Sequence, residues 1–430
     1  MRRIGGARRI ALAAVVAGAL ACAGVLEAEA AVQLSLISRT STGAPANGTS
    51  TVYLSGSTLS GDGSVAAFSS RAPNLPQGDG STFQTYVRDI PSGATSIASV
   101  DNQGVAATDA TFSPAISPSG RLVAFHGTGT GLPRANGVDQ VWVHDMATGK
   151  TRLVSAGPNG GPGNRLSLYP SFSPDGRYVA FASSAGNLPG GNGSDIFVYI
   201  RDLELGKTIL ASKAADGSPA SALGGAALSS NGRFVVFHSN DPGLPPATIY
   251  DHVYRRNLQT GSVLLIDKAN NGEVANKNGS SPSITPDGRF VSFESLSSNL
   301  PGGRPEHQQC YVRDVREGKT ILVGRNNAGV AQNGDCSNPS MSADGRYVSF
   351  YARATNLPGG DGVTDEVYVR DLSLGTTTLL SKAANSDPAD DDSRFPWISG
   401  DGRWVEFASD ANNLGGNPAF TQVFRAGPIG

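Results

Sequence analysis

The feature that most constrains this chain is a long repeat. Seven times, at intervals of 56 or 57 residues, a Gly begins a short apolar run whose fifth residue is Phe. A period of this length is too long for a pair of helices and fits four short strands with their connections, the unit of a propeller blade. The repeat therefore predicts an all-β protein, a seven-bladed β-propeller of four-stranded antiparallel blades. The pairs are Gly63 with Phe68, Gly120 with Phe125, Gly176 with Phe181, Gly232 with Phe237, Gly288 with Phe293, Gly345 with Phe350 and Gly402 with Phe407.

The third repeat shows how the sequence makes one blade. Its pattern predicts strands A to D at residues 170–173, 178–181, 196–200 and 207–212. Asp175-Gly176 suits a tight A–B hairpin, because Gly reaches positive φ without a Cβ clash. The B–C and D–A connections are long and variable, so we expect them to lie together on one face of the ring, the loop face. Variable loops on a rigid scaffold are where ligands bind.

The two ends of the chain predict how the ring closes. The last repeat stops after its third strand, at residues 423–425, and residues 34–38 have the pattern of a strand D with no blade before it. We therefore expect the N-terminal strand to complete blade seven. That pairing removes an open sheet edge, which is an aggregation hazard.

The first thirty residues have the pattern of a targeting segment. Four Arg precede an apolar run over residues 10–25, and Ala28-Glu29-Ala30 offers a small-x-small cleavage site. We predict a signal peptide at residues 1–30, a propeller at residues 31–430 and a secreted or periplasmic location. A lipoprotein anchored through Cys22 is the less favoured alternative. The apolar run is short for a membrane span, so none is expected.

The charge balance bears on the partner. The whole chain has a net charge of −2, and removing the first thirty residues takes away four Arg and two Glu, which leaves −4. A nucleic-acid binder needs a basic stripe to track the phosphates. The sequence therefore argues against nucleic acid and leaves proteins, glycans and small molecules open.

The repeat resembles a known family. The phrase Pro-Ser-x-Ser-Pro-Asp-Gly-Arg-x-Val-x-Phe at residues 170–181, found nearly unchanged at 282–293, resembles the WD40-like repeat of the TolB β-propeller family. Asn-Leu-Pro-Gly-Gly phrases begin at Asn187, Asn299 and Asn356 and are similar to those of uncharacterised secreted bacterial members. The resemblance covers nearly all of the chain after residue 30 and implies the fold, but it says little about function. TolB carries an α/β domain ahead of its propeller, so we expect a relative and not TolB itself.

Other propeller families fit less well. Prolyl oligopeptidase relatives carry a Gly-x-Ser-x-Gly elbow, which this sequence lacks. Sialidase-type propellers space Asp and Gly differently. Oligogalacturonate lyases share the repeat and use a cluster of His around a metal near the axis, whereas no predicted strand A here contains a His.

Repeated polar residues are interpreted as structural. The Arg-Asp pair that follows strand C, as in Arg201-Asp202, recurs in most blades, which is typical of a cap for turn amides. The repeated Asn of Asn-Leu-Pro has the same interpretation. His126 and His238 occupy the slot after the strand-B Phe, where Glu294 and Tyr351 stand in later blades. We interpret this slot as a strand end near solvent that tolerates polar residues.

One departure from the repeat carries a possible metal site. Residues 390–397 read Asp-Asp-Asp-Ser-Arg-Phe-Pro-Trp, so three consecutive carboxylates lead toward the opening of the ring. Asp390, Asp391 and Asp392 are candidate ligands for Ca²⁺, and no other cofactor is expected. With the Arg and Trp that follow, the same segment is also a candidate for a cationic or sugar ligand. The alternative is a solvated acidic loop. Residues 360–365 form a weaker Ca²⁺ candidate.

The second departure is a pair of cysteines. Cys310 and Cys336 are the only cysteines after residue 30, and export makes a disulfide chemically reasonable. Cys310 begins strand C of blade five, and Cys336 lies in the loop that leads to strand A of blade six. We predict a disulfide between them that holds this loop in place.

Together these patterns favour a monomeric, exported propeller that binds a protein or glycan through its loop face without catalysis. The alternative is a secreted polysaccharide lyase or hydrolase with a site built from loops. The sequence favours a protein that is not an enzyme, without deciding the question. The candidate binding residues near the central mouth stand just before the strands A: Arg165, Tyr169, Asn278, Asp335, Asn338, Asp392, Arg394 and Trp397.

Overall fold

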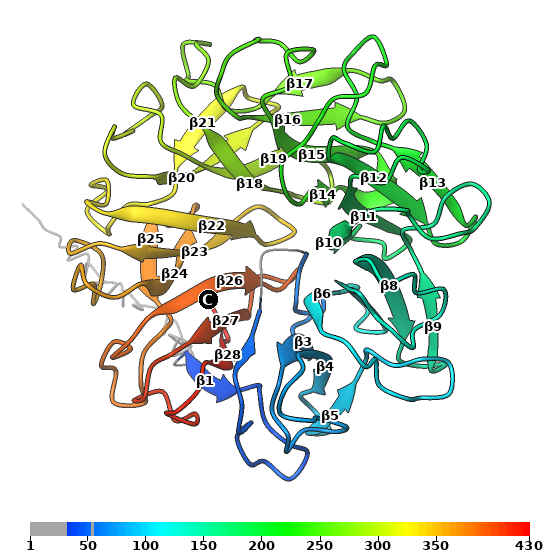
Figure 1. Cartoon of the computed structure of the whole chain (residues 1–430). Coiled ribbons are helices and arrows are strands. Elements are labelled where there is room, and N and C mark those ends of the chain that lie inside the picture. Colours follow the sequence, from blue (N-terminus) through cyan, green and yellow to red (C-terminus); the bar gives the residue numbers. More distant parts are fainter. Residues whose placement is uncertain (1–31, 53–55) are drawn as a thin grey trace, which may run out of the picture.

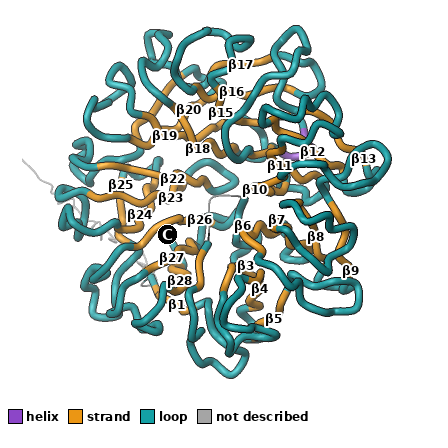
Figure 2. The backbone as a smooth tube through the Cα atoms, viewed as in Figure 1, coloured by secondary structure: helices purple, strands orange, loops and turns teal. Residues whose placement is uncertain are grey.

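The computed structural model describes residues 32–52 and 56–430, so the predicted signal peptide lies outside the described residues. Within these ranges the strands form seven four-stranded antiparallel sheets, arranged as a ring around a central axis (Figure 1). The predicted seven-bladed β-propeller is therefore confirmed. Loops make up most of the remaining backbone (Figure 2), and the one helical element described is a short 3-10 turn, η1 (Ser230–Gly232). None of the described helical segments has the length and apolarity to span a bilayer.

Each blade runs from an innermost strand A to an outermost strand D. Blades one to three consist of β2 (Ser50–Thr51), β3 (Val65–Ser70), β4 (Gln84–Asp89) and β5 (Ala94–Ile97); β6 (Thr111–Ile116), β7 (Leu122–Gly127), β8 (Gln140–Asp145) and β9 (Lys150–Leu153); and β10 (Ser167–Phe172), β11 (Tyr178–Ser183), β12 (Phe197–Asp202) and β13 (Lys207–Leu210). Blades four and five consist of β14 (Ala227–Leu228), β15 (Phe234–Ser239), β16 (His252–Asn257) and β17 (Val263–Leu265); and β18 (Gly279–Ile284), β19 (Phe290–Ser295), β20 (Gln309–Asp314) and β21 (Lys319–Leu322). Blade six consists of β22 (Asp335–Met341), β23 (Tyr347–Arg353), β24 (Glu366–Asp371) and β25 (Thr376–Leu379), and blade seven of β26 (Ser393–Ile398), β27 (Val405–Ser409), β28 (Gln422–Gly427) and β1 (Gln33–Leu36).

The N-terminal strand closes the ring as predicted. β1 pairs antiparallel with β28, in a register that places Gln33 opposite Gly427 and Leu36 opposite Phe424. The pairing continues past the strand, where the Ile37 amide donates to the Val423 carbonyl over 2.8 Å. Residues from the two ends of the chain therefore share one sheet, and the outer edge of β28 is covered.

The repeated Gly lies in the tight A–B turn. Gly288 has φ of +75°, and a Cβ there would lie 2.4 Å from Cδ2 of Phe234 in the preceding blade. The neighbouring Asp287 carboxylate accepts hydrogen bonds from the Arg289 amide over 2.9 Å and from the Thr285 hydroxyl over 2.7 Å. Gly thus permits both the turn and the close approach of two blades.

The repeated Phe forms the core of each blade together with an aromatic residue of strand C. Phe181 lies directly opposite Tyr199, the ring centroids are 5.7 Å apart, and both side chains are fully buried. Burying a side chain of this size contributes roughly 1.5–3 kcal/mol to stability. The equivalent pairs are Phe68–Tyr86, Phe125–Trp142, Phe237–Tyr254, Phe293–Tyr311, Phe350–Tyr368 and Phe407–Phe424.

The structural interpretation of the repeated Arg-Asp and Asn-Leu-Pro residues is confirmed. The Asp202 carboxylate accepts hydrogen bonds from the Glu204 and Leu205 amides over 2.9 and 3.0 Å, and it pairs with Arg177 at 2.6 Å. The Asn187 side chain donates to the Pro162 carbonyl over 2.9 Å. Both residue types therefore hold turns and loops in shape.

Strand A is irregular where it enters the ring, a feature that the predicted regular strand did not include. Its register against strand B shifts by a bulge in blades two, three, five, six and seven. In each case a residue of positive φ precedes a Pro, and bulges of this kind redirect neighbouring side chains. The residues of positive φ are Ser113, Tyr169, Ser281, Asn338 and Phe395, with φ of 49, 56, 50, 53 and 58°.

Candidate functional site

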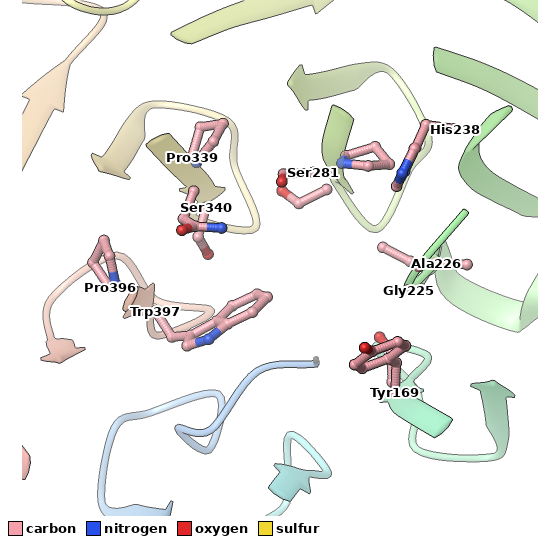
Figure 3. Close-up of a pocket in the computed structure, with 15 residues that line it drawn as sticks. Tyr169, Gly225, Ala226, His238, Ser281, Pro339, Ser340, Pro396 and Trp397 are labelled. Atoms are coloured by element: carbon pink, nitrogen blue, oxygen red, sulfur yellow. The ribbon is translucent and has the colours of Figure 1, made fainter. Parts of the chain in front are cut away.

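A cavity of about 220 Å³ lies at the loop-face end of the ring axis. Its walls come from the innermost strands of blades three, five, six and seven, from β14 and the loop before it, and from His238 of β15 (Figure 3). The closed ring is what brings these distant segments together. The lining residues are Tyr169, Ser171, Gly224, Gly225, Ala226, Ala227, His238, Ser281, Pro282, Ser283, Asn338, Pro339, Ser340, Pro396 and Trp397.

The cavity combines aromatic rings with uncharged polar groups. The Tyr169 and Trp397 side chains border the open space between the strands (Figure 3). The Asn338 amide, the Ser281 hydroxyl and several other hydroxyl groups supply hydrogen-bond donors and acceptors. No Asp, Glu, Lys or Arg stands among the described lining residues. This arrangement suits a neutral ligand that has both an apolar face and hydroxyl groups.

The bulges of strand A position the polar residues of the lining. One buried carboxylate forms hydrogen bonds with residues at two of these bulges. Glu294 of β19 accepts hydrogen bonds from the Ser280 and Ser281 hydroxyls, over 2.9 and 2.8 Å. Its second oxygen accepts from the Asn338 amide of the next blade, over 2.9 Å. Glu294 therefore links blades five and six at the wall of the cavity. The sequence showed that Glu294 occupies the position after the strand-B Phe, but it did not show which residues Glu294 contacts.

The expectation that this slot lies near solvent is wrong for His126, whereas His238 is half-buried. His126 is only 7% exposed, and its ring meets the Tyr169 ring edge-on at 5.8 Å. His238 lines the cavity itself. Burial lowers the pKa of each imidazole to about 4, so both are neutral at physiological pH.

Three of the eight predicted binding residues line the cavity: Tyr169, Asn338 and Trp397. Arg165 is exposed on the loop leading to β10 and lies outside the lining. The other side chains hold neighbouring loops. The oxygen atoms of Asn278, Asp335 and Asp392 accept hydrogen bonds from the amides of Asp251, Gln308 and Asp365, over 3.2, 2.9 and 2.8 Å.

Arg394 belongs to a charge network at the edge of blade seven. Its guanidinium pairs with Asp365 at 2.6 Å and also with Asp392. Arg353 approaches the same two carboxylates at 3.3 and 3.4 Å. Two cations thus face two anions, which leaves this network without an excess of negative charge.

The three consecutive carboxylates of the acidic loop separate in the structure. Asp390 accepts hydrogen bonds from the Asn412 and Asn413 amides over 2.6 and 3.3 Å, whereas Asp391 accepts from the Asp392 amide over 2.7 Å. Across residues 32–52 and 56–430, no three His, Cys, Asp or Glu side chains are grouped so that they could hold a metal ion. Ca²⁺ binding by this loop stays a prediction.

A further polar cluster in blade four was not predicted. His252 Nδ1 lies 2.7 Å from the Asp267 carboxylate, and His252 Nε2 lies 2.9 Å from the Thr248 hydroxyl. Burial raises the pKa of Asp267 to about 6, opposed by the hydrogen bond with His252. The same two positions of blade two hold Gln140 and Ser155, joined by a 2.6 Å hydrogen bond. The His–Asp pair therefore replaces a structural pair of the repeat, and it lies outside the cavity lining.

Glu406 stands in blade seven at the strand-B position where the other six blades have Ala, Val or Ser. It lies opposite Trp397 across the β26–β27 pair and is fully buried. Burial raises its pKa well above the usual range, and the Thr58 hydroxyl and the Arg425 charge oppose this shift. Burial therefore favours the protonated, neutral form of this side chain.

The predicted disulfide is present. Cys310 and Cys336 are bonded, with their Cα atoms 5.6 Å apart. The predicted position of Cys336 was wrong in one respect, because this residue lies within β22 and not in the loop before it. The bond therefore joins strand C of blade five directly to strand A of blade six.

Comparison with solved structures shows the same fold in distant proteins. An oligogalacturonate lyase from Vibrio parahaemolyticus is 13% identical, with 92% of this chain and 96% of that chain covered and a TM-score of 0.56. An oligogalacturonate lyase in complex with manganese is 14% identical over 93% and 96% of the two chains, with a TM-score of 0.55. The β-propeller domain of the Trilobed protease from Pyrococcus furiosus is 16% identical over 89% and 94%, with a TM-score of 0.50.

TolB from Acinetobacter baumannii is also similar, at 15% identity and a TM-score of 0.43. The match covers 69% of this chain and 58% of the TolB chain. No family model and no curated protein matches the sequence. At these identities the likeness shows the propeller fold alone, and membership of the TolB-like repeat family stays a prediction.

Proposed function

We propose that this chain is an exported binding module that takes up a neutral glycan in the loop-face cavity, without catalysis of its own. The observation that carries the proposal is the pairing of the Tyr169 and Trp397 rings with the hydroxyl and amide groups of the same wall. The apolar face of a sugar ring packs on aromatic side chains, while its hydroxyls exchange hydrogen bonds with Ser and Asn. A protein ligand would meet the surrounding loops instead, and it forms the second arm of the test below.

The environment of the titratable groups supports binding over proton transfer. The general acid or base of a lyase or hydrolase needs a pKa close to the working pH. Burial lowers the pKa of His238, the one imidazole in the described lining, to about 4. Catalysis by a lyase or hydrolase therefore remains the less supported alternative.

Export is supported by the disulfide together with the pattern of the first thirty residues. Disulfides persist in oxidising compartments such as the periplasm and the exterior of the cell. The bond between Cys310 and Cys336 is buried and joins two blades. We propose a monomer in such a compartment.

The test is a binding screen of the purified protein against neutral and acidic oligosaccharides, read by thermal shift and then by calorimetry. Ligand binding raises the melting temperature by mass action. We expect neutral sugars to bind, and we expect Tyr169→Ala and Trp397→Ala each to weaken binding about tenfold or more. Arg165→Ala is the matched control, because Arg165 lies on the same face outside the cavity, and it should leave the affinity within about twofold.

Three outcomes would redirect the proposal. If sugar binding survives the loss of both aromatic rings, the sugar binds outside the cavity. A shift that requires Ca²⁺, is abolished by EDTA and is lost in Asp391→Ala would establish the predicted metal site on the acidic loop. No shift with any sugar would overturn the glycan proposal, and a search for a protein partner by cross-linking in the producing cell would follow.

A further inference from the structure

A second cavity, of about 450 Å³, lies at the opposite end of the ring axis, among the tight A–B turns. Every blade contributes one large apolar side chain to its wall, always four residues before the repeated Gly. We call this set the apolar ring: Leu59, Ile116, Phe172, Leu228, Ile284, Met341 and Ile398.

The side chains of the apolar ring border this cavity to different degrees: Phe172, Ile284 and Met341 are half-buried, whereas Leu59, Ile116, Leu228 and Ile398 are only 1–3% exposed. Apolar residues at the centre of a fold normally pack to near-crystalline density. Here they leave a volume about three times that of the engineered apolar cavity of about 150 Å³ that binds benzene. Space of this size lined by apolar side chains favours an apolar guest, because burying the guest removes its hydrocarbon surface from water.

The two cavities share part of their wall inside the ring. Five residues line both of them: Ser171, Ala227, Ser283, Ser340 and Trp397. No Asp, Glu, Lys or Arg stands among the described lining residues of either cavity. Along the axis the wall therefore changes from aromatic and amide groups at the loop face, through a band of Ser hydroxyls, to the apolar ring, and it carries no formal charge throughout.

We propose that this channel binds an amphiphile with a neutral sugar head and an alkyl or acyl chain. The head occupies the loop-face cavity, and the chain passes Trp397 and lies within the apolar ring. The proposal rests on the proposed function for the position of the head. A charged head would lose its hydration without finding a counter-charge in the lining, so neutral heads are selected.

The test is calorimetry on the purified protein with glucose and with hexyl, octyl and decyl glucosides, each below its critical micelle concentration. If the chain enters the apolar ring, the affinity rises two- to about fourfold for each added methylene, since this is the range expected for hydrocarbon leaving water. Octyl sulfate should bind at least about tenfold more weakly than octyl glucoside.

The outcomes separate the two proposals. If sugars bind with an affinity that does not depend on chain length, the amphiphile proposal is wrong and the proposed function stands. Absence of binding by glucose and by all three glucosides overturns both. Equal affinity for octyl sulfate and octyl glucoside overturns the assignment of a neutral head.

Variants that fill the second cavity test whether the alkyl chain of the ligand lies there. Met341→Trp occupies part of the cavity from the apolar ring, and Ala343→Trp does so from the exposed rim if the first variant folds poorly. Each should reduce the gain per methylene to less than about 1.5-fold and leave the affinity for glucose unchanged. Ser119→Trp adds the same side chain on the same face outside the lining and should keep the full gain. A full gain in both cavity variants would overturn the proposal.

Discussion

At the scale of single residues, Glu366 has the clearest predictable consequence. It is the first residue of strand C in blade six, a position held by Gln in four other blades, and it is 1% exposed. Burial raises its pKa to about 8, opposed by a hydrogen bond from Ser381. The repeat thus shows which neutral side chain this site accommodates, and it shows why a carboxylate there is costly above neutral pH.

The pH dependence follows from this raised pKa. At about pH 4 Glu366 is protonated in both states. Between pH 4.5 and 8 the unfolded chain loses the proton while the folded chain keeps it, so the free energy of unfolding falls, and it falls no further above pH 8. Glu366→Gln removes this loss, so the variant should match the wild type near pH 4 and exceed it by roughly 2–4 kcal/mol at pH 8. Urea unfolding at both pH values measures the difference.

The reverse substitution is the control. Gln140 occupies the same position in blade two, where its amide nitrogen donates to the Gly163 carbonyl over 2.8 Å. Gln140→Glu should destabilise the protein more at pH 8 than at pH 4. If Glu366→Gln gains equally at both pH values, titration of this carboxyl does not limit stability.

At the scale of elements, the disulfide joins two strands that other blades join differently. Thr85 and Thr111 occupy the equivalent positions between blades one and two, and their hydroxyls lie 3.0 Å apart. The bond between Cys310 and Cys336 closes a loop with a sequence separation of 26 residues. Cross-links of this span stabilise by about 2–4 kcal/mol, because they restrict the unfolded chain.

The double variant Cys310→Thr, Cys336→Thr should keep the fold, because the repeat already accepts a Thr pair at this place. We expect its free energy of unfolding to be lower by about 2–4 kcal/mol in urea titrations. Dithiothreitol should destabilise the wild type to a similar extent and leave the double variant unchanged. An equal response of both proteins to the reductant would show that the bond contributes nothing to stability.

The irregular start of strand A shows what element-level prediction missed. Residues 170–172 were expected as part of a regular strand, and the structure begins β10 earlier, at Ser167, with a bulge at Tyr169. A residue before Pro is normally extended, so the sequence offered no reason to expect positive φ there. The bulge arises because the inner strand must bend where it enters the crowded centre of the ring.

At the scale of the whole molecule, β1 holds the ring closed. It supplies the outer strand of blade seven, and Ile37 just beyond it is 1% exposed. Deletion of residues 32–38 uncovers the edge of β28, so we expect a loss of cooperative unfolding and association into larger species on size-exclusion chromatography.

Two further variants of the protein serve as controls for the deletion. A chain that begins at residue 31 keeps β1 and should elute as a monomer. Ile37→Asp keeps the strand but buries a charge beside Val423, and it should lower the melting temperature without complete loss of the fold. If the deleted chain elutes as a monomer with an unchanged melting temperature, β1 is not needed for closure.

The sequence by itself determined the blade number, the strand order, the tight turns, the closure and the pairing of the cysteines. The first four depend on local patterns that recur seven times, or on two ends of the chain that complete each other's pattern, and the cysteine pairing follows because only two cysteines stand after residue 30. Tertiary structure alone decided which predicted residues meet: it brought Tyr169, Asn338 and Trp397 to one cavity, turned Asp392 and Arg394 toward each other, buried His126 and placed His238 in the cavity wall. The axis is shared by all blades, so its contacts depend on bulges and loop paths that no single repeat encodes.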